Sequence, residues 1–236
     1  MLDAALASVD FSKLVLAVGG LGTAAYGLVD ATKALGGGVS RAGFGDIKKV
    51  ISQLIPTASA SGRPASALTQ ESAYDTLRAN WMNGMALPDQ KSVAKALIKL
   101  NLTPQSAKDM ASVTGVDSDL LSGVAEKLKL SGNDKAVDKT LTDAESNAYG
   151  RFDLLLSALL DQAYQRGDQR YRNSAKLLAM FFSVGLAMLG FYEVLGSGHN
   201  VLGFLTGLLA VPLAPIAKDL ASTIQAGAKI AQLWKK

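Results

Sequence analysis

Three long apolar stretches stand out in this chain. Elsewhere polar and apolar residues are mixed at helical spacing, as in a soluble helical protein. The three stretches cover residues 14–35, 175–195 and 201–217, and each contains a run without charged side chains. A helix needs about 20 apolar residues to cross the hydrocarbon core of a bilayer. The stretches are at or slightly below that length, and we therefore expect three transmembrane helices.

The first stretch also has features of a secretory signal peptide. Signal peptides begin with a positively charged segment and end at a small-residue cleavage site. Here Asp3 and Asp10 make the leading segment acidic, glycines break the apolar run, and no cleavage site with a polar continuation is evident. We interpret the stretch as an uncleaved membrane span, so that residues 1–35 form an N-terminal transmembrane helix.

Lysine and arginine are distributed unevenly around the three spans. Lys13 alone precedes the first span and four basic residues follow it; four precede the second span, and four follow the third. The loop 196–200 has none. Basic residues beside membrane spans accumulate on the cytoplasmic side. The pattern predicts a multi-pass protein of the cytoplasmic (inner) membrane, with the N-terminus outside and both the middle region and the C-terminus in the cytoplasm.

Residues 67–142 have the pattern of a small cytoplasmic helical bundle. Apolar residues recur at helical spacing in four short segments between Thr69 and Leu130, which are bounded by capping residues, proline or glycine. Thr103 before Pro104 is a strong start signal. No segment shows the period of two that is typical of a strand. Because so few residues bury little surface, we expect the bundle to pack on a neighbouring helix or on another subunit.

One nearly continuous helix is predicted from Asp143 to about Leu195. Thr142 and Glu145 match a capping box at its start, and no proline follows until the third span. Residues 143–174 would form a cytoplasmic stalk, which leads directly into a transmembrane hairpin over residues 175–217.

Two further segments are amphipathic. Residues 36–66 open with three glycines, continue with apolar residues at helical spacing from 44 to 54, and end in a linker of small and helix-breaking residues. The helical part either lies along the inner headgroups or packs on the bundle, and the sequence leaves both open. Residues 218–236 continue an apolar stripe after Pro212 and Pro215, which interrupt the third helix. We expect a kink there and a C-terminal amphipathic helix, which lies either on the inner leaflet or against the cytoplasmic stalk of a neighbouring copy.

Basic and aromatic side chains near the span ends are candidates for contact with lipid headgroups, because both are favoured at that depth. Membrane lipids are accordingly the first expected partners. The candidates are Lys48, Lys49, Arg170, Tyr171, Arg172, Lys176, Trp234, Lys235 and Lys236.

Small residues spaced four apart are candidates for close helix packing in a membrane. This packing would join spans of one chain or join copies in a homo-oligomer, and the spacing does not decide between the two. In the first span the rows are Gly19, Thr23 and Gly27, and Gly20 and Ala24; the third span contributes Gly203 and Gly207.

Composition narrows the possible chemistry. The 236 residues include no Cys and a single His, His199, so disulfides, thiolate chemistry and multi-histidine metal sites are excluded. No nucleotide-binding loop, nucleophile–base pair or catalytic pair of carboxylates stands out. We therefore predict a protein that is not an enzyme, with no catalytic, cofactor-binding or metal-binding residues.

One segment, residues 106–127, resembles a helix-turn-helix. Ala111, Gly115 and Leu121 have the spacing of its tight turn. A helix that reads DNA would begin with basic or amide side chains, whereas this one begins with Asp117 and Asp119, which repel phosphate. Nucleic acid is therefore not an expected partner.

Together these patterns predict an all-α integral membrane protein, in which three transmembrane helices and a helical cytoplasmic domain are joined by a long continuous helix. The first functional hypothesis is a non-enzymatic scaffold or docking platform that self-assembles in the membrane and binds a cytoplasmic protein. The alternative is an oligomeric channel or pore-forming effector gated by the bundle. Three spans are few to enclose a route, so a channel would need several copies.

Overall fold

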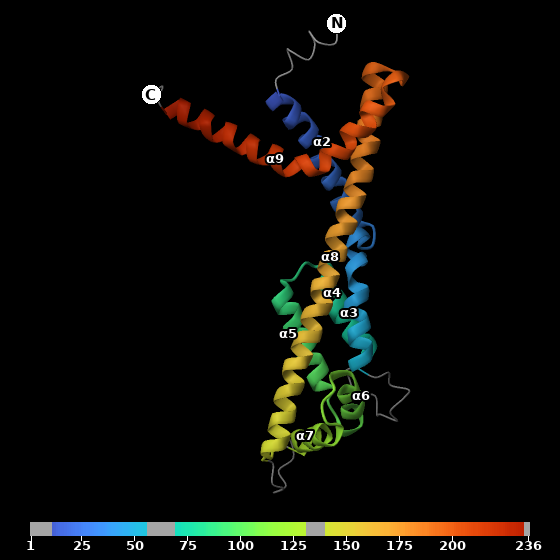
Figure 1. The fold of residues 1–236 in the computed structure, drawn as a ribbon, viewed down its shortest axis with the longest axis vertical. Coiled ribbons are helices and arrows are strands. Elements are labelled where there is room, and N and C mark those ends of the chain that lie inside the picture. The colour runs from blue at the N-terminus through green and yellow to red at the C-terminus, as the bar shows by residue number, and fades with distance from the viewer. Residues whose placement is uncertain (1–10, 56–68, 131–139, 234–236) are drawn as a thin grey trace. The chain divides into compact units, whose positions relative to one another are not determined.

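The computed structural model describes residues 11–55, 69–130 and 140–233, which form helices and short connections without any strand (Figure 1). The chain divides into two compact units. The first, here called the apolar unit, comprises residues 1–39 and 172–236; the second, the bundle unit, comprises residues 40–171. The helical fold class expected from the sequence is confirmed for the described residues.

Three helices of the described chain are long and apolar enough to cross a membrane, as the sequence predicts. They are α2 (Phe11–Ala31), α8 (Asp143–Leu195) and α9 (Asn200–Leu233). Short 3-10 turns connect or follow them: η1 (Thr32–Ala34), η2 (Gly38–Ser40) and η4 (Ser197–His199). The predicted continuous helix from Asp143 to Leu195 is confirmed, and it contributes residues to both units.

Helix α9 contains both of the prolines that were expected to interrupt it. Pro212 and Pro215 lie inside the helix, which continues without a break to Leu233, and Figure 1 shows that α9 bends along its length. The expected interruption is therefore wrong, whereas the expected bend is present. Proline removes one backbone hydrogen bond and crowds the preceding turn, which kinks a helix without having to end it.

The bundle unit contains α3 (Arg41–Leu54), α4 (Gln70–Met82), α5 (Leu87–Leu100), α6 (Pro104–Thr114), α7 (Ser118–Leu130) and the first part of α8. The four short helices predicted between Thr69 and Leu130 are thus confirmed. Residues 56–66, the expected linker, fall in a part of the chain outside the described residues.

Local capping signals set these helix ends. The Thr69 hydroxyl accepts a hydrogen bond from the Ser72 amide at 3.1 Å, and Thr103 forms a capping box with Ser106. Gly115 ends α6 with φ of 68°, a left-handed conformation that costs glycine no steric penalty. Each interaction satisfies backbone groups that a helix end leaves without a partner inside the helix.

The capping box at the start of α8 is also confirmed. The Thr142 amide donates to Glu145 Oε2 at 2.7 Å, and the Glu145 amide donates to Thr142 Oγ1 at 3.3 Å. Lys127 of α7 donates to the same carboxylate oxygen at 2.6 Å. The hydrogen bond from Lys127, followed by those from Thr142, lowers the pKa of Glu145 below its ordinary value. The cap therefore ties the end of α7 to the start of α8.

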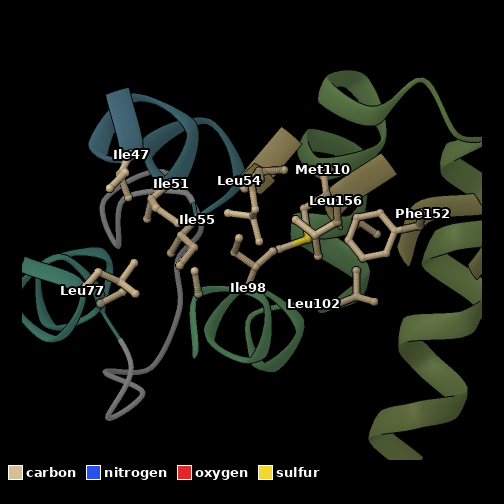
Figure 2. Close-up of a cluster of buried hydrophobic side chains, with 14 of the residues drawn as sticks. Ile47, Ile51, Leu54, Ile55, Leu77, Ile98, Leu102, Met110, Phe152 and Leu156 are labelled. Atoms are coloured by element: carbon tan, nitrogen blue, oxygen red, sulfur yellow. The ribbon is translucent and has the colours of Figure 1, made fainter. Parts of the chain in front are cut away.

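A single apolar core runs through the bundle unit (Figure 2). Every helix of the unit contributes fully buried side chains to it, including α3. The apolar face of α3 is therefore packed on the bundle, which is one of the two alternatives that the sequence left open. The stalk part of α8 supplies the neighbouring surface that the short helices need. Central members are Ile47, Ile51, Leu54, Leu77, Ile98, Met110, Leu121, Phe152 and Leu156.

Two residues of α8 provide a direct test of this core. We expect Phe152→Ala to lower the free energy of unfolding by about 3–5 kcal/mol, because the ring is fully buried and its loss leaves a cavity. Leu154→Ala is expected to change that free energy by about 0.5 kcal/mol or less, since Leu154 is 72% exposed. Urea titration of the full chain in detergent micelles measures both through Trp81 fluorescence, in a Trp234→Phe background. Equal losses in the two variants would contradict this description of the core.

Candidate functional site

Helices α2 and α9 touch backbone to backbone. A Cβ atom added to Gly19 would stand 2.1 Å from Ala217 Cβ, and one added to Gly22 would stand 2.1 Å from the Ala210 carbonyl oxygen. No real Cβ atom approaches so closely, so both positions require glycine or a shift of the helices. The contact face of α2 consists of buried residues at helical spacing, namely Val15, Gly19, Gly22, Ala25 and Val29.

Glycine also lets α9 approach α8 within the apolar unit. A Cβ atom on Gly207 would lie 2.4 Å from Val184 Cα, and one on Gly203 would lie 3.1 Å from Met188 Cα. Between them, the buried Ser183 hydroxyl donates to the Gly207 carbonyl oxygen at 2.7 Å. In an apolar environment such a bond satisfies a polar group that would otherwise be costly to bury.

The small residues singled out from the sequence thus separate into two groups. Gly19, Gly203 and Gly207 lie in contacts inside one chain. The rest, Gly20, Thr23, Ala24 and Gly27, are exposed, and a Cβ atom on Gly20 or Gly27 would meet nothing within 4 Å. Gly22 was missed by the sequence reasoning, which considered only spacings of four. Its position three residues after Gly19, the other spacing that keeps residues on one helix face, was the available signal.

The exposed small residues of α2 extend into a longer row, which we call the α2 seam. Its members alternate spacings of three and four along the helix, and all are exposed. At 3.6 residues per turn, the seam lies on the side of α2 opposite the face packed on α9. A spacing of three and four is the one with which two helices pack along their length. The α2 seam consists of Ala17, Gly20, Ala24, Gly27 and Ala31.

In the bundle unit, α3 crosses α8 at a third glycine contact. A Cβ atom on Gly43 would stand 2.2 Å from the Gly167 carbonyl oxygen. Beside the crossing, Arg170 Nε lies 3.1 Å from Asp46 Oδ2. Trp81 packs beside the crossing. Its indole N–H donates to the Ser40 carbonyl oxygen at 2.7 Å, and its ring lies edge-on to that of Tyr171, with 6.4 Å between the ring centres. Arg170 and Tyr171, expected at the headgroups, thus also contribute to packing within the bundle unit.

The other candidates for headgroup contact have different surroundings. Lys48 and Lys49 lie on the exposed face of α3, and Lys48 Nζ lies 5.3 Å from the centre of the Tyr74 ring. Arg172 and Lys176 are exposed on α8. The three C-terminal candidates, Trp234, Lys235 and Lys236, lie outside the described residues.

A groove of about 430 Å³ separates the exposed sides of α3 and α4. Its walls carry three basic side chains and two acidic ones around an apolar floor. The basic residues are Arg41, Lys48 and Arg78, and the acidic residues are Glu71 and Asp75. In this groove, aromatic, cationic and anionic side chains line a common hollow.

A row of lysines on α5 pairs with carboxylates on α8. Lys91 Nζ lies 2.5 Å from Asp161 Oδ1, Lys95 Nζ lies 2.7 Å from Asp153 Oδ2, and Lys99 also contacts Asp153. Burial alone would raise the pKa of Asp153, but the hydrogen bonds from Lys95 and Lys99 outweigh it and lower the pKa. The pairs fix α5 against α8 and leave the lysine row largely neutralised.

The segment that resembles a helix-turn-helix folds with its spacing residues in the expected places. Ala111 and Leu121 are buried, and Gly115 makes the left-handed turn. The Asp117 carboxylate accepts hydrogen bonds from the amides of Asp119 and Leu120, at 2.9 and 3.0 Å. Its acidic start is therefore the N-cap of α7, a structural role. Among the described residues, no group of three acidic or histidine side chains is placed to hold a metal ion.

Comparison with known proteins found no matching family model, no matching curated protein and no matching solved structure.

The Asp153 cluster predicts how stability depends on acidity. The pKa of the Asp153 carboxyl is lower in the folded chain than the value of about 3.9 expected when unfolded. The ion pairs of Asp153 therefore stabilise the fold at pH values above about 3.9. The contribution is lost as the pH falls through the lower, folded pKa. We expect the urea midpoint of the wild type to fall between about pH 5 and pH 3, and less steeply for Asp153→Asn. Parallel pH profiles for the two proteins would show that Asp153 does not carry the effect.

Proposed function

We propose that this chain is a non-enzymatic membrane protein that self-associates through the α2 seam and carries its bundle unit as a platform at the cytoplasmic face. The observation that carries the proposal is the unoccupied seam itself. Between lipid tails, apolar bulk gives helices no reason to associate, and close backbone approach at small residues does. The seam presents five small residues in register on one exposed face.

The other helix contacts of the apolar unit are also made by close packing at glycine, which supports the seam as an interface. Gly19 and Gly22 already join α2 to α9, and Gly207 joins α9 to α8. The chain therefore makes its internal helix contacts through glycine, and the seam offers the same type of surface on the side of α2 that no other described helix covers. A second copy in the same bilayer presents the identical seam at the same depth, which favours a symmetric pair.

The charge distribution supports one orientation. Basic residues flank the apolar helices everywhere except at the N-terminal end of α2, where Lys13 is alone, and in the loop 196–200. We infer that the protein lies in the inner membrane. The N-terminus and this loop lie outside, and the bundle unit and the end of α9 lie in the cytoplasm.

No comparable observation favours the channel hypothesis. Water-filled pores need polar groups along the route. Residues 14–29, 177–192 and 201–217 contain no charged side chain. Among the described polar residues of these stretches, the Ser183 and Thr23 hydroxyls each donate to a backbone carbonyl oxygen of the chain. Copies of these helices would therefore present a lining without charged groups, and the scaffold hypothesis is retained.

Cysteine crosslinking tests self-association cleanly, because the natural chain contains no Cys. We expect Ala24→Cys, on the seam, to give a disulfide-linked dimer on mild oxidation in membranes. Ala25→Cys is the matched control, since Ala25 lies at nearly the same depth but is fully buried against α9. A dimer band from both variants, or from neither, would overturn the seam as the interface.

Two glycine substitutions then separate association from folding. Gly20→Leu is expected to weaken dimerisation in detergent about tenfold or more, with no loss of thermal stability, because its Cβ meets nothing within 4 Å. Gly22→Leu is expected to lower thermal stability, because its side chain would collide with the α9 backbone.

Orientation is tested by labelling with a membrane-impermeant maleimide. We expect His199→Cys to react in intact cells and Lys49→Cys to react only after the membrane is permeabilised. The reverse result would invert the proposed topology, and recovery of the chain in the soluble fraction without detergent would refute the membrane location.

A further inference from the structure

The groove between α3 and α4 has defined ends, because the two helices run antiparallel. The indole N–H of Trp81, near the end of α4, bonds to the Ser40 carbonyl oxygen at the start of α3. At the other end, the Gln70 amide side chain bonds to the carbonyl oxygens of Ser52 and Ile55. The groove between them can therefore be followed from the Ser40 end to the Ile55 end.

Charges in the groove are sorted along this direction. Arg41 directly follows Ser40, and Arg78 precedes Trp81 by one helical turn, so both guanidinium groups belong to the Ser40 end. Asp75 lies one turn further along α4 and Glu71 lies a further turn away, toward the Ile55 end. The groove thus passes from a pair of guanidinium groups to a pair of carboxylates, and its third cation, Lys48, lies over the Tyr74 ring in the half that carries the carboxylates.

These four side chains are available to a ligand. Within the described residues, Arg41, Arg78, Glu71 and Asp75 take part in no ion pair, and all four are exposed. This contrasts with the lysine row of α5, whose charges are paired across to α8. The ring of Tyr74 is already covered by the Lys48 ammonium, at 5.3 Å from its centre. The two carboxylates are therefore the groups left in this half of the groove to attract a cationic group of a ligand, against the like charge of Lys48.

The cationic end is also the end from which the chain continues toward the apolar helices. Ser40 and Tyr171 are the first and last residues of the bundle unit, and Arg41 lies ten positions after Ala31, the last residue of α2. Phe44 and Met82 supply apolar surface at this end of the groove. A ligand that matches the order of groups along the groove has an apolar chain, then a phosphate, then an ammonium group.

We propose that the α3–α4 groove binds the headgroup of a phospholipid of the phosphatidylethanolamine type. The phosphate is held by Arg41 and Arg78, and the primary ammonium is held by Asp75 and Glu71. Guanidinium–phosphate and ammonium–carboxylate contacts are charge-assisted hydrogen bonds, which are stronger than neutral ones. The inference rests on the proposed placement of the bundle unit at the membrane, but the binding itself does not require self-association.

Native mass spectrometry of the full-length protein in detergent tests the proposal. Short-chain phosphatidylethanolamine, phosphatidylglycerol and glycerophosphoethanolamine are titrated separately, and bound molecules are counted. We expect one phosphatidylethanolamine per chain, bound about tenfold more tightly than phosphatidylglycerol, which lacks the ammonium, or than the soluble headgroup, which lacks the chains. Equal binding of the soluble headgroup would show that the ligand is a free phosphate ester, and would overturn the lipid assignment.

Paired substitutions identify the two ends of the site. Arg41→Ala with Arg78→Ala is expected to weaken binding of both lipids about tenfold or more. Asp75→Asn with Glu71→Gln is expected to abolish the preference for phosphatidylethanolamine while phosphatidylglycerol still binds. Arg151→Ala, an exposed arginine of α8 outside the groove, is the control and should change neither lipid's affinity.

Two results would refute the headgroup site: lipid affinities that none of the groove substitutions changes, or a preference for phosphatidylethanolamine that survives loss of both carboxylates. Because binding is measured on chains in detergent, it is independent of the Ala24→Cys crosslink. A negative crosslink with positive lipid binding would reject self-association alone, and the opposite pair of results would reject the headgroup site alone.

Discussion

Contact between helix backbones at glycine is the interaction on which both units depend. It occurs where α2 meets α9 at Gly19 and Gly22, where α9 meets α8 at Gly207, and where α3 meets α8 at Gly43 and Gly167. Close approach brings many backbone atoms within van der Waals range, and the gain in dispersion energy comes from their number. In an apolar solvent this gain replaces the hydrophobic effect as the source of helix association.

The bundle unit adds a conventional hydrophobic core to its glycine contact. Its helices are short, and none of them buries enough surface to be stable alone. Phe152 and Leu156 of α8 complete the core, while the pairs from Lys95 and Lys99 to Asp153 align α5 along the same helix. The unit consequently depends on α8, the helix that it shares with the apolar unit.

Much of the fold follows from local signals in the sequence. Thr69, Thr103, Asp117 and Thr142 each begin a helix by bonding to its first amides, an interaction set within four residues of chain. The side on which α3 packs was not predictable, because an amphipathic helix satisfies its apolar face equally on a bilayer or on a protein core. The prolines of α9 gave a wrong prediction of a helix break for a related reason. Contacts with neighbouring helices allow a helix to continue through a residue that weakens it locally.

The candidate sites were predictable only in part. The small residues of α2 are evident in the sequence, but which of them face α9 depends on how the helix is rotated about its axis. The sequence does not encode that rotation locally. Gly22 and Gly20 have the same side chain and lie two residues apart, yet one is in contact and the other is open. The groove between α3 and α4 was not anticipated, because its charges come from two segments that only the tertiary fold brings together.

The crossing of Gly43 and Gly167 has a consequence for how this sequence can change through evolution. Each residue occupies the space into which the other's side chain would extend, so any larger residue at one position is excluded by the backbone at the other. A compensating change at the partner does not exist, since nothing is smaller than glycine. Drift at these two sites is therefore blocked in both directions at once. Gly45 and Gly150, on the same helices but with open space around them, remain free to vary.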